Sequence, residues 1–184
     1  MKTPKHTLAA FFLFAGVGLS PLLAGNPVVG GQKMLPTKNI VENAANSADH
    51  TTLVAAVKAA GLVETLQGAG PFTVFAPTNA AFGKLPDGTV ATLLKPENKD
   101  QLAGILTYHV VLGKMSAEEV VAAIKSGDGT AELTTVQGGK LIGSLDGDKV
   151  ILTDEKGGTS TVTIADVFQS NGVIHVVDTV LMPD

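Results

Sequence analysis

The most regular hydrophobic pattern in the chain lies at residues 72–76, where aromatic and β-branched side chains alternate between two faces. That alternation predicts a half-buried β-strand. Pro77 cannot donate a hydrogen bond to a neighbouring strand, so the strand is predicted to end there. Thr78 is then a suitable N-cap for a short helix that turns Phe82 inward.

A second apolar run covers residues 173–181 and is almost continuously β-branched. Such a run is typical of a strand that is buried on both faces. Asn171-Gly172, directly before the run, is a strong turn signal. His175 lies within the run, on the face opposite to both of its neighbours. This position favours a hydrogen-bonded histidine of the core or sheet surface.

The rest of the pattern predicts short helices early in the chain and strands late in it. Residues 50–60 have the apolar spacing of a helix, with Asp49 as N-cap and Gly61 ending it in a left-handed conformation. A capping box at residues 116–119 opens another helix that runs to about residue 125. Further helices are predicted at residues 39–45, 62–66, 89–94 and 98–106, and strands at residues 108–111, 140–145, 149–153 and 159–167. This order indicates an α+β architecture.

Three stretches, taken in order, resemble the fasciclin-domain family: residues 70–82, the Tyr108-His109 pair and residues 170–183. The resemblance covers roughly residues 39–184. It implies a fasciclin-like fold, a β-wedge of two sheets with several short helices packed on one side. The residues that carry the two sequence boxes of the family are Phe75, Pro77, Thr78, Asn79, Phe82, Asn171, Gly172 and His175.

The N-terminus has the features of a bacterial secretion signal. Lys2 and Lys5 precede an apolar segment over residues 8–19, and a cleavage region follows. We therefore expect residues 1–24 to be a signal peptide, residues 25–38 a flexible leader and residues 39–184 one domain. The apolar segment is shorter than the ~20 residues that span a bilayer, so no stable membrane insertion is expected after cleavage. The expected location is periplasmic, extracellular or at the cell surface.

Charge and composition exclude several classes of function. The formal net charge is −4, and all 13 basic residues are lysines, so nucleic-acid binding is not expected. The chain has no cysteine, which removes disulfides and thiolate metal sites. No spacing matches a metal site, a nucleophile elbow or a phosphate-binding loop, so we expect no metal, no cofactor and no enzymatic activity.

Tyr108-His109 is the first candidate site. A histidine can act as a general base, a metal ligand or a pH switch. The alternative is a buried histidine that hydrogen-bonds its neighbours, for which Thr78 and Asn79 are the predicted partners. In matrix proteins such as periostin, the region of the corresponding pair is associated with integrin-mediated adhesion. The resemblance therefore implies a partner contact here.

Asp166-Val167 is the second candidate site. In adhesive animal fasciclin domains, an Asp-Ile pair shortly before the Asn-Gly of the second box is implicated in integrin recognition. Here valine replaces the isoleucine. The alternative is an aspartate at a strand end that accepts backbone hydrogen bonds in a turn.

The resemblance and the expected export favour a secreted, non-enzymatic adhesion domain, monomeric or weakly self-associating. Its expected partner is a cell-surface or matrix protein or glycan. A second hypothesis is a soluble carrier of an apolar small molecule such as a lipid, because the aliphatic content is high. A third is a hydrolase that uses His109 and an acid.

Overall fold

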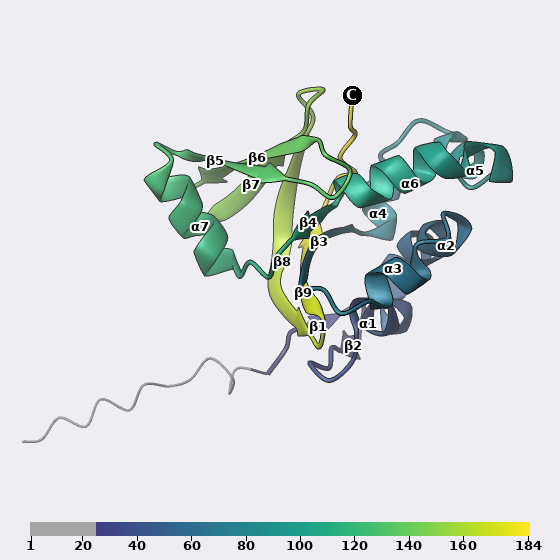
Figure 1. The fold of residues 1–184 in the computed structure, drawn as a ribbon, viewed down its shortest axis with the longest axis horizontal. Helices are drawn as coiled ribbons and strands as arrows, with labels where there is room; N and C mark the ends of the chain where they lie inside the picture. The colour runs from purple at the N-terminus through teal and green to yellow at the C-terminus, as the bar shows by residue number, and fades with distance from the viewer. Residues whose placement is uncertain (1–24) are drawn as a thin grey trace, which may run out of the picture.

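A computed structural model describes residues 25–184 (Figure 1), so the predicted signal peptide at residues 1–24 lies outside the described residues. The chain forms a small hairpin, a large sheet and a set of short helices. The helices are α1 (Ile40–Asn46), α2 (Thr51–Ala59), α3 (Val63–Gln67), α4 (Asn79–Gly83), α5 (Thr89–Leu93), α6 (Lys99–Tyr108) and α7 (Ala117–Ser126). Single 3-10 turns precede α2 (Ala48–His50) and α6 (Pro96–Asn98).

The large sheet has seven strands in the order β4-β3-β9-β8-β7-β6-β5. Its strands are β3 (Phe72–Pro77), β4 (Val110–Leu112), β5 (Thr130–Thr134), β6 (Lys140–Asp146), β7 (Lys149–Thr153), β8 (Thr159–Gln169) and β9 (Gly172–Val177). Only the β3–β9 pair is parallel. The long strand β8 pairs with β9 on one side and β7 on the other. It therefore joins two half-sheets, β4-β3-β9-β8 and β8-β7-β6-β5.

The two half-sheets fold toward each other into a wedge. A bridge between Val111 and Thr135 brings the end of β5 back to β4. The Val136 amide also donates to the Val110 carbonyl at 2.7 Å. Helix α7 packs against β5 and β6 on the side away from the other helices (Figure 1). The α+β architecture agrees with the sequence prediction, and the wedge agrees with what the fasciclin resemblance implies.

Two hydrophobic cores lie on opposite faces of β3 and β9. Helices α1–α6 cover the outer face and form the helix-side core, which includes Val74, Ala76, Ile174 and Val176. The wedge core lies between the half-sheets and α7. Its fully buried side chains include Phe75, Tyr108, Ile124, Leu141, Leu152, Val177 and Leu181. The period-two alternation of the strands thus sends alternate side chains of β3 and β9 into different cores.

Several local predictions are confirmed. β3 ends at Pro77, and the Thr78 hydroxyl accepts the Ala81 amide at 3.2 Å at the start of α4. The Ser116–Glu119 capping box opens α7. Gly61 has φ +71° directly after α2 and its C-cap. β6 and β7 form the predicted hairpin.

Three local predictions are wrong. Tyr108 ends helix α6 and does not begin a strand, because residues 102, 105 and 106 continue the buried face of the helix up to it. Asp49 does not cap α2, which begins at Thr51 after a 3-10 turn with no side-chain cap. β9 stops at Val177 and is shorter than the apolar run, because the side chain of Asp178, and not its carbonyl, accepts the Thr161 amide. The Asp178 amide still donates to the Thr161 carbonyl at 3.1 Å.

The segment at residues 25–38 differs from the flexible leader that its glycines and prolines predict. It contains a two-stranded hairpin, β1 (Val28–Val29) and β2 (Gln32–Lys33). Val29 and Met34 are buried in the helix-side core at 3% and 2% exposure. Burial of these two apolar side chains orders the segment, which turn chemistry alone does not reveal.

Candidate functional site

Tyr108 and His109 lie at the junction between α6 and β4, and both are buried. The His109 Nδ1 atom lies 2.8 Å from the Ile105 carbonyl oxygen, and Nε2 lies 3.0 Å from the Leu181 amide nitrogen. Because a carbonyl only accepts and an amide only donates, Nδ1 carries the proton and Nε2 accepts. Burial lowers the pKa of His109 to about 4, so the ring is neutral at pH 7.

This geometry occupies both nitrogens of His109 with backbone groups. The ring ties α6 to the C-terminal segment and keeps no lone pair free for a metal ion or for proton abstraction. The prediction that Thr78 and Asn79 are the hydrogen-bond partners of His109 is wrong. The Thr78 hydroxyl caps α4, and the Asn79 side chain bonds to the start of α2. The Asn79 side chain accepts the Thr52 amide at 3.0 Å and donates to the Ala48 carbonyl at 2.9 Å.

Tyr108 connects the same helix end to the wedge. Its hydroxyl donates to the Lys140 carbonyl at 2.7 Å and accepts the Glu155 amide at 3.2 Å. Burial raises the pKa of Tyr108 to about 12. Thus the pair joins α6, β6 and the C-terminal segment through backbone groups of all three.

Asp166 lies inside β8, whereas the structural alternative for this residue places it in a turn at a strand end. Its carboxylate does accept a backbone amide, as that alternative predicts. Asp166 has φ +58° and sits at a register shift in the pairing with β9, so it forms part of a β-bulge after which the strand resumes. Its Oδ1 atom accepts the amide of Ala117, the first residue of α7, at 2.7 Å. Asp166 is half-buried, whereas its neighbour Val167 is 1% exposed and packs in the helix-side core.

His175 links this bulge to the same loop. Its Nε2 atom donates to the Met115 carbonyl at 2.8 Å, and its Nδ1 atom accepts the Asp166 amide at 3.3 Å. The ring stacks on Phe75 with centroids 5.7 Å apart. Burial lowers the pKa of His175. Asp166 and His175 are therefore one cluster that holds the start of α7 against β8 and β9.

The contribution of residues 115–117 to this cluster is absent from the sequence prediction. The capping box correctly places the start of α7, but its contact with β8 is a long-range one. The amide of Ala117, the first residue of α7, has no partner within its own helix. This is the signal that could have indicated an acidic partner such as Asp166.

Asn171-Gly172 fixes the N-terminal end of β9. The Asn171 side chain accepts the Ile40 amide at 3.1 Å and donates to the carbonyls of Leu66 and Gly68 at 2.8 and 2.9 Å. A Cβ on Gly172 would lie 2.1 Å from the Phe72 carbonyl oxygen, so only glycine fits beside β3. This turn anchors α1 and α3 to the sheet.

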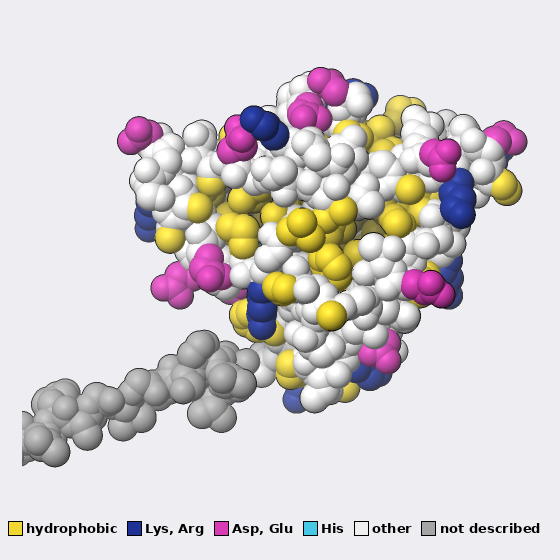
Figure 2. Space-filling view, in the orientation of Figure 1, with side chains coloured by type: hydrophobic (Ala, Val, Ile, Leu, Met, Phe, Trp, Pro, Cys, Tyr) yellow, Lys and Arg dark blue, Asp and Glu magenta, His cyan; other side chains and the backbone are white. Residues whose placement is uncertain are grey.

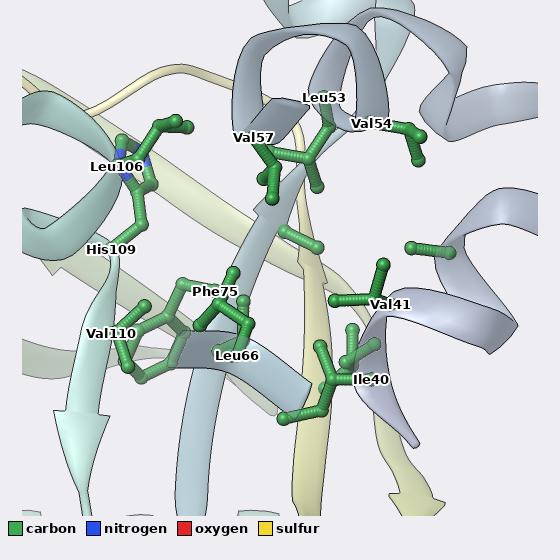
Figure 3. Close-up of a pocket in the computed structure, with 14 residues that line it drawn as sticks. Ile40, Val41, Leu53, Val54, Val57, Leu66, Phe75, Leu106, His109 and Val110 are labelled. Carbon is green, nitrogen blue, oxygen red and sulfur yellow. The ribbon is translucent and has the colours of Figure 1, made fainter. Parts of the chain in front are cut away.

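An apolar cavity lies between α1, α2, α3 and the sheet, with Leu106, His109 and Val110 on one side and Val41 and Val54 facing them (Figure 3). Its volume is about 30 Å³. Sites for drug-sized ligands measure roughly 300–1,000 Å³. The cavity is therefore a packing defect in this conformation and not a preformed lipid site.

Residues 25–184 contain no group of three or more histidine, aspartate or glutamate side chains that could hold a metal ion. No helix in that range is long and apolar enough to cross a membrane.

Comparisons with known proteins agree with this geometry. The family model of the fasciclin domain matches residues 48–183, and the chain belongs to the fasciclin-domain family. It is 54% identical to protein sll1483 of Synechocystis sp. over 144 residues, which cover 78% of this chain and 73% of that protein. It is 36% identical to the cell surface glycolipoprotein MPB83 of Mycobacterium bovis, over 91% of this chain and 71% of that one.

A solved structure shares the fold. The FAS1 domain pair of the insect cell adhesion molecule Fasciclin I matches with a TM-score of 0.69 at 17% identity. The match covers 79% of this chain and 51% of that one. The family to which the chain belongs is therefore one that includes cell adhesion and cell-surface proteins.

Proposed function

We propose that this protein is a secreted, non-enzymatic adhesion domain that contacts a protein or glycan at a cell surface, in the envelope or in the extracellular matrix. Family membership is the observation that carries the proposal. The roles of His109 and His175 support its non-enzymatic part. Both rings use their two nitrogens to hold backbone groups of other elements.

The face around Asp166 is the part of the predicted contact region that a partner reaches. Tyr108, His109 and Val167 are 0%, 2% and 1% exposed. Direct contact with these three side chains would need the fold to open. Asp166 is half-buried, and only its Oδ1 atom has a hydrogen-bond partner within residues 25–184. We therefore take the second carboxylate oxygen of Asp166 as the group that a partner would contact.

The test is retention of surface components by the immobilised full chain. A membrane and matrix extract from the organism that makes the protein is passed over wild type and Asp166→Asn. Asparagine tolerates a left-handed backbone and keeps the oxygen that accepts the Ala117 amide, so mainly the charge changes. Asp128→Asn is the matched control, because Asp128 is an exposed aspartate with φ +56° elsewhere in the chain.

A surface protein or glycan retained by wild type and by Asp128→Asn, and lost with Asp166→Asn, is the expected result. Equal retention by all three proteins would keep adhesion but place the contact elsewhere. Retention of no surface component at all would contradict adhesion. Recovery of a small apolar molecule alone would favour the carrier hypothesis.

A further inference from the structure

The first strand pair of the chain covers part of the large sheet. Residues 26–35 form the N-terminal hairpin, which includes β1 and β2 (Figure 1). Val29 and Met34 of this hairpin are buried in the helix-side core. At its tip, the Gly30 carbonyl accepts the Ala48 amide at 3.4 Å. The hairpin therefore lies over the turn that precedes α2 and over the neighbouring part of β8 and β9.

An asparagine side chain fastens each end of the N-terminal hairpin. Asn26 accepts the Phe168 amide of β8 at 3.0 Å and donates to the Phe168 carbonyl. Asn43 of α1 accepts the Leu35 amide at 3.1 Å and donates to the Leu35 carbonyl at 2.8 Å. The hairpin precedes residue 48, where the match to the fasciclin-domain model begins. Because these bonds are separate from the pairing of the seven-stranded sheet, the hairpin can open while that sheet stays folded.

His50 lies under this cover. It belongs to the 3-10 turn before α2 and is 3% exposed. Together with Val29 and Met34 of the hairpin and Val167 of β8, it lines a cavity of about 10 Å³. Val167 is 1% exposed and belongs to the predicted contact pair Asp166-Val167. The hairpin thus separates both His50 and Val167 from solvent.

The two ring nitrogens of His50 are bonded unequally. Nδ1 lies 2.9 Å from the Ser47 Oγ atom. Nε2 is buried and has no hydrogen-bond partner within residues 25–184. The Ala76 carbonyl is close enough to favour the protonated ring, but it makes no hydrogen bond of normal geometry with Nε2. Burial outweighs this effect and lowers the pKa of His50, so the ring is neutral at pH 7.

The charged groups around His50 offer a protonated ring little compensation. Asp49, in the same turn, favours the protonated form but is exposed to solvent. Strand β3 has no charged residue. The charged or titratable side chains of the other surrounding elements are exposed or bonded to the segment at residues 115–117: Lys33 on β2, Glu42 on α1, Lys58 on α2, Asp166 on β8 and His175 on β9. A charge on His50 therefore has to be hydrated, and hydration requires the cover to open.

We propose that the N-terminal hairpin is an acid-released cover over Val167 and that His50 is the group that releases it. In the closed form, the hairpin buries Val167 and holds the backbone of Phe168. In the open form, both become accessible beside Asp166 to the adhesion partner. This inference rests on the proposed function and specifies the regulation of its site.

The direction of the pH effect follows from the two forms of His50. In the closed form its pKa lies below the ordinary value of 6.5, whereas in the open form the ring is hydrated and regains that value. The open form therefore binds the proton more tightly. Below pH 6.5, the ratio of open to closed hairpin should rise by up to about tenfold for each pH unit, until the pH reaches the lower pKa of the closed form.

Amide hydrogen exchange of the full chain, followed by NMR at pH 7.5 and pH 5.5, tests the proposal. The reporters are the amides of Leu35, Ala48 and Phe168, each of which is bonded between the hairpin and the rest of the domain. The Phe75 amide, which donates to the His109 carbonyl at 2.9 Å, reports on the whole domain. Protection factors correct for the pH dependence of the chemical exchange step. Those of the three reporters should fall at least about threefold at pH 5.5 and stay well below that of Phe75.

His50→Phe separates the titration of His50 from other effects of acid. Phenylalanine fills the site but cannot be protonated, so the three reporters should not lose protection relative to Phe75 on acidification. His50→Asn, which keeps an acceptor for the Ser47 hydroxyl, serves if His50→Phe does not fold. Met34→Ala is the positive control. It removes a buried contact of the hairpin and should lower the protection of the reporters at least about tenfold at pH 7.5.

Equal loss of reporter protection in wild type and in the His50 variants would overturn the proposal. So would a Phe75 amide that exchanges as fast as the reporters, because the hairpin would then not open separately. Retention of a surface protein from the extract is measured in parallel, and wild type should retain more at pH 5.5 than at pH 7.5, whereas His50→Phe should not. If the hairpin opens and retention does not change, the adhesion function stands and its regulation by the hairpin is wrong. If wild type retains nothing at either pH, the adhesion function itself fails.

Discussion

The helix-side core and the wedge core share β3 and β9 but are closed to different degrees. On the helix side, six helices cover the sheet, and the apolar cavity between α1, α2, α3 and the sheet has a volume of about 30 Å³. On the wedge side, α7 leaves a cleft of about 380 Å³ where β7 and β8 separate.

Figure 2 shows that apolar side chains also gather in the middle of this view, over β4 and between α3 and α6, where the surface is hollowed. Yet the cavity in that region is small and has no polar lining apart from His109, whose nitrogens are occupied. The wedge side combines space with the half-buried Asp166 carboxylate nearby. An apolar surface alone therefore does not define a binding site.

Both cores are required for folding, and truncation of Phe75 should have the largest effect. Phe75→Ala removes a side chain that is 1% exposed in the wedge core and should lower the free energy of unfolding by about 3–5 kcal/mol. Val176→Ala, at 2% exposure on the helix side, should cost about 2 kcal/mol. Urea denaturation measures both, and wild-type midpoints would show that the core assignments are wrong.

Burial of neutral His109 should make the free energy of unfolding depend on pH. Its pKa is about 4 in the folded chain and has the ordinary value of 6.5 when unfolded, so the unfolded chain binds the proton more tightly. The contribution of neutral His109 to the free energy of unfolding is complete above pH 6.5 and is lost as the pH falls toward 4. The loss at pH 4 should reach about 3 kcal/mol.

Denaturation of wild type and His109→Gln between pH 7 and pH 4 isolates this effect. The variant should be less stable at pH 7 but should lose less stability on acidification. Parallel pH profiles for the two proteins would mean that His109 is not held neutral by burial.

Two asparagines anchor helices to the sheet at different depths. Asn171 is 8% exposed and bonds three backbone groups, so Asn171→Ala should cost about 2–3 kcal/mol. Asn79 is half-buried and its partners can be hydrated, so Asn79→Ala should cost about 1 kcal/mol. Thermal unfolding of both variants tests the order, and the reverse order would contradict it.

Asp166→Asn should have the smallest effect on stability, within about 0.5 kcal/mol of wild type, because backbone conformation and the bond to Ala117 are kept. Asp166→Ala loses that bond and should be less stable than Asp166→Asn. Equal stability of the two variants would mean that the carboxylate does not position α7.

Local elements could be predicted from the sequence because their signals are local. The end of β3 at Pro77, the Thr78 cap and the capping box of α7 each depend on residues within one turn. The error at Tyr108 arose because an aromatic residue before two valines also fits a strand, whereas packing of the preceding helix decides the boundary.

The site depends on contacts that no local pattern contains. Asp166 lies at a bulge with left-handed backbone, and its partner Ala117 is 49 residues away. The sequence predicts a strand over residues 159–167, but it predicts neither the bulge at Asp166 nor the continuation of the strand to Gln169. Similarly, Val29 and Met34 order the predicted leader only through burial in the helix-side core.

Amide hydrogen exchange of the full chain, alone and saturated with a retained surface protein, compares the two regions in one measurement. Exchange should slow at residues 117–121 and 161–166, where a partner bound around Asp166 would shield the amides, and stay unchanged around Tyr108-His109 and the cavity of Figure 3. Slowing confined to α1, α2 and the end of α6, with none along β8, would contradict the account.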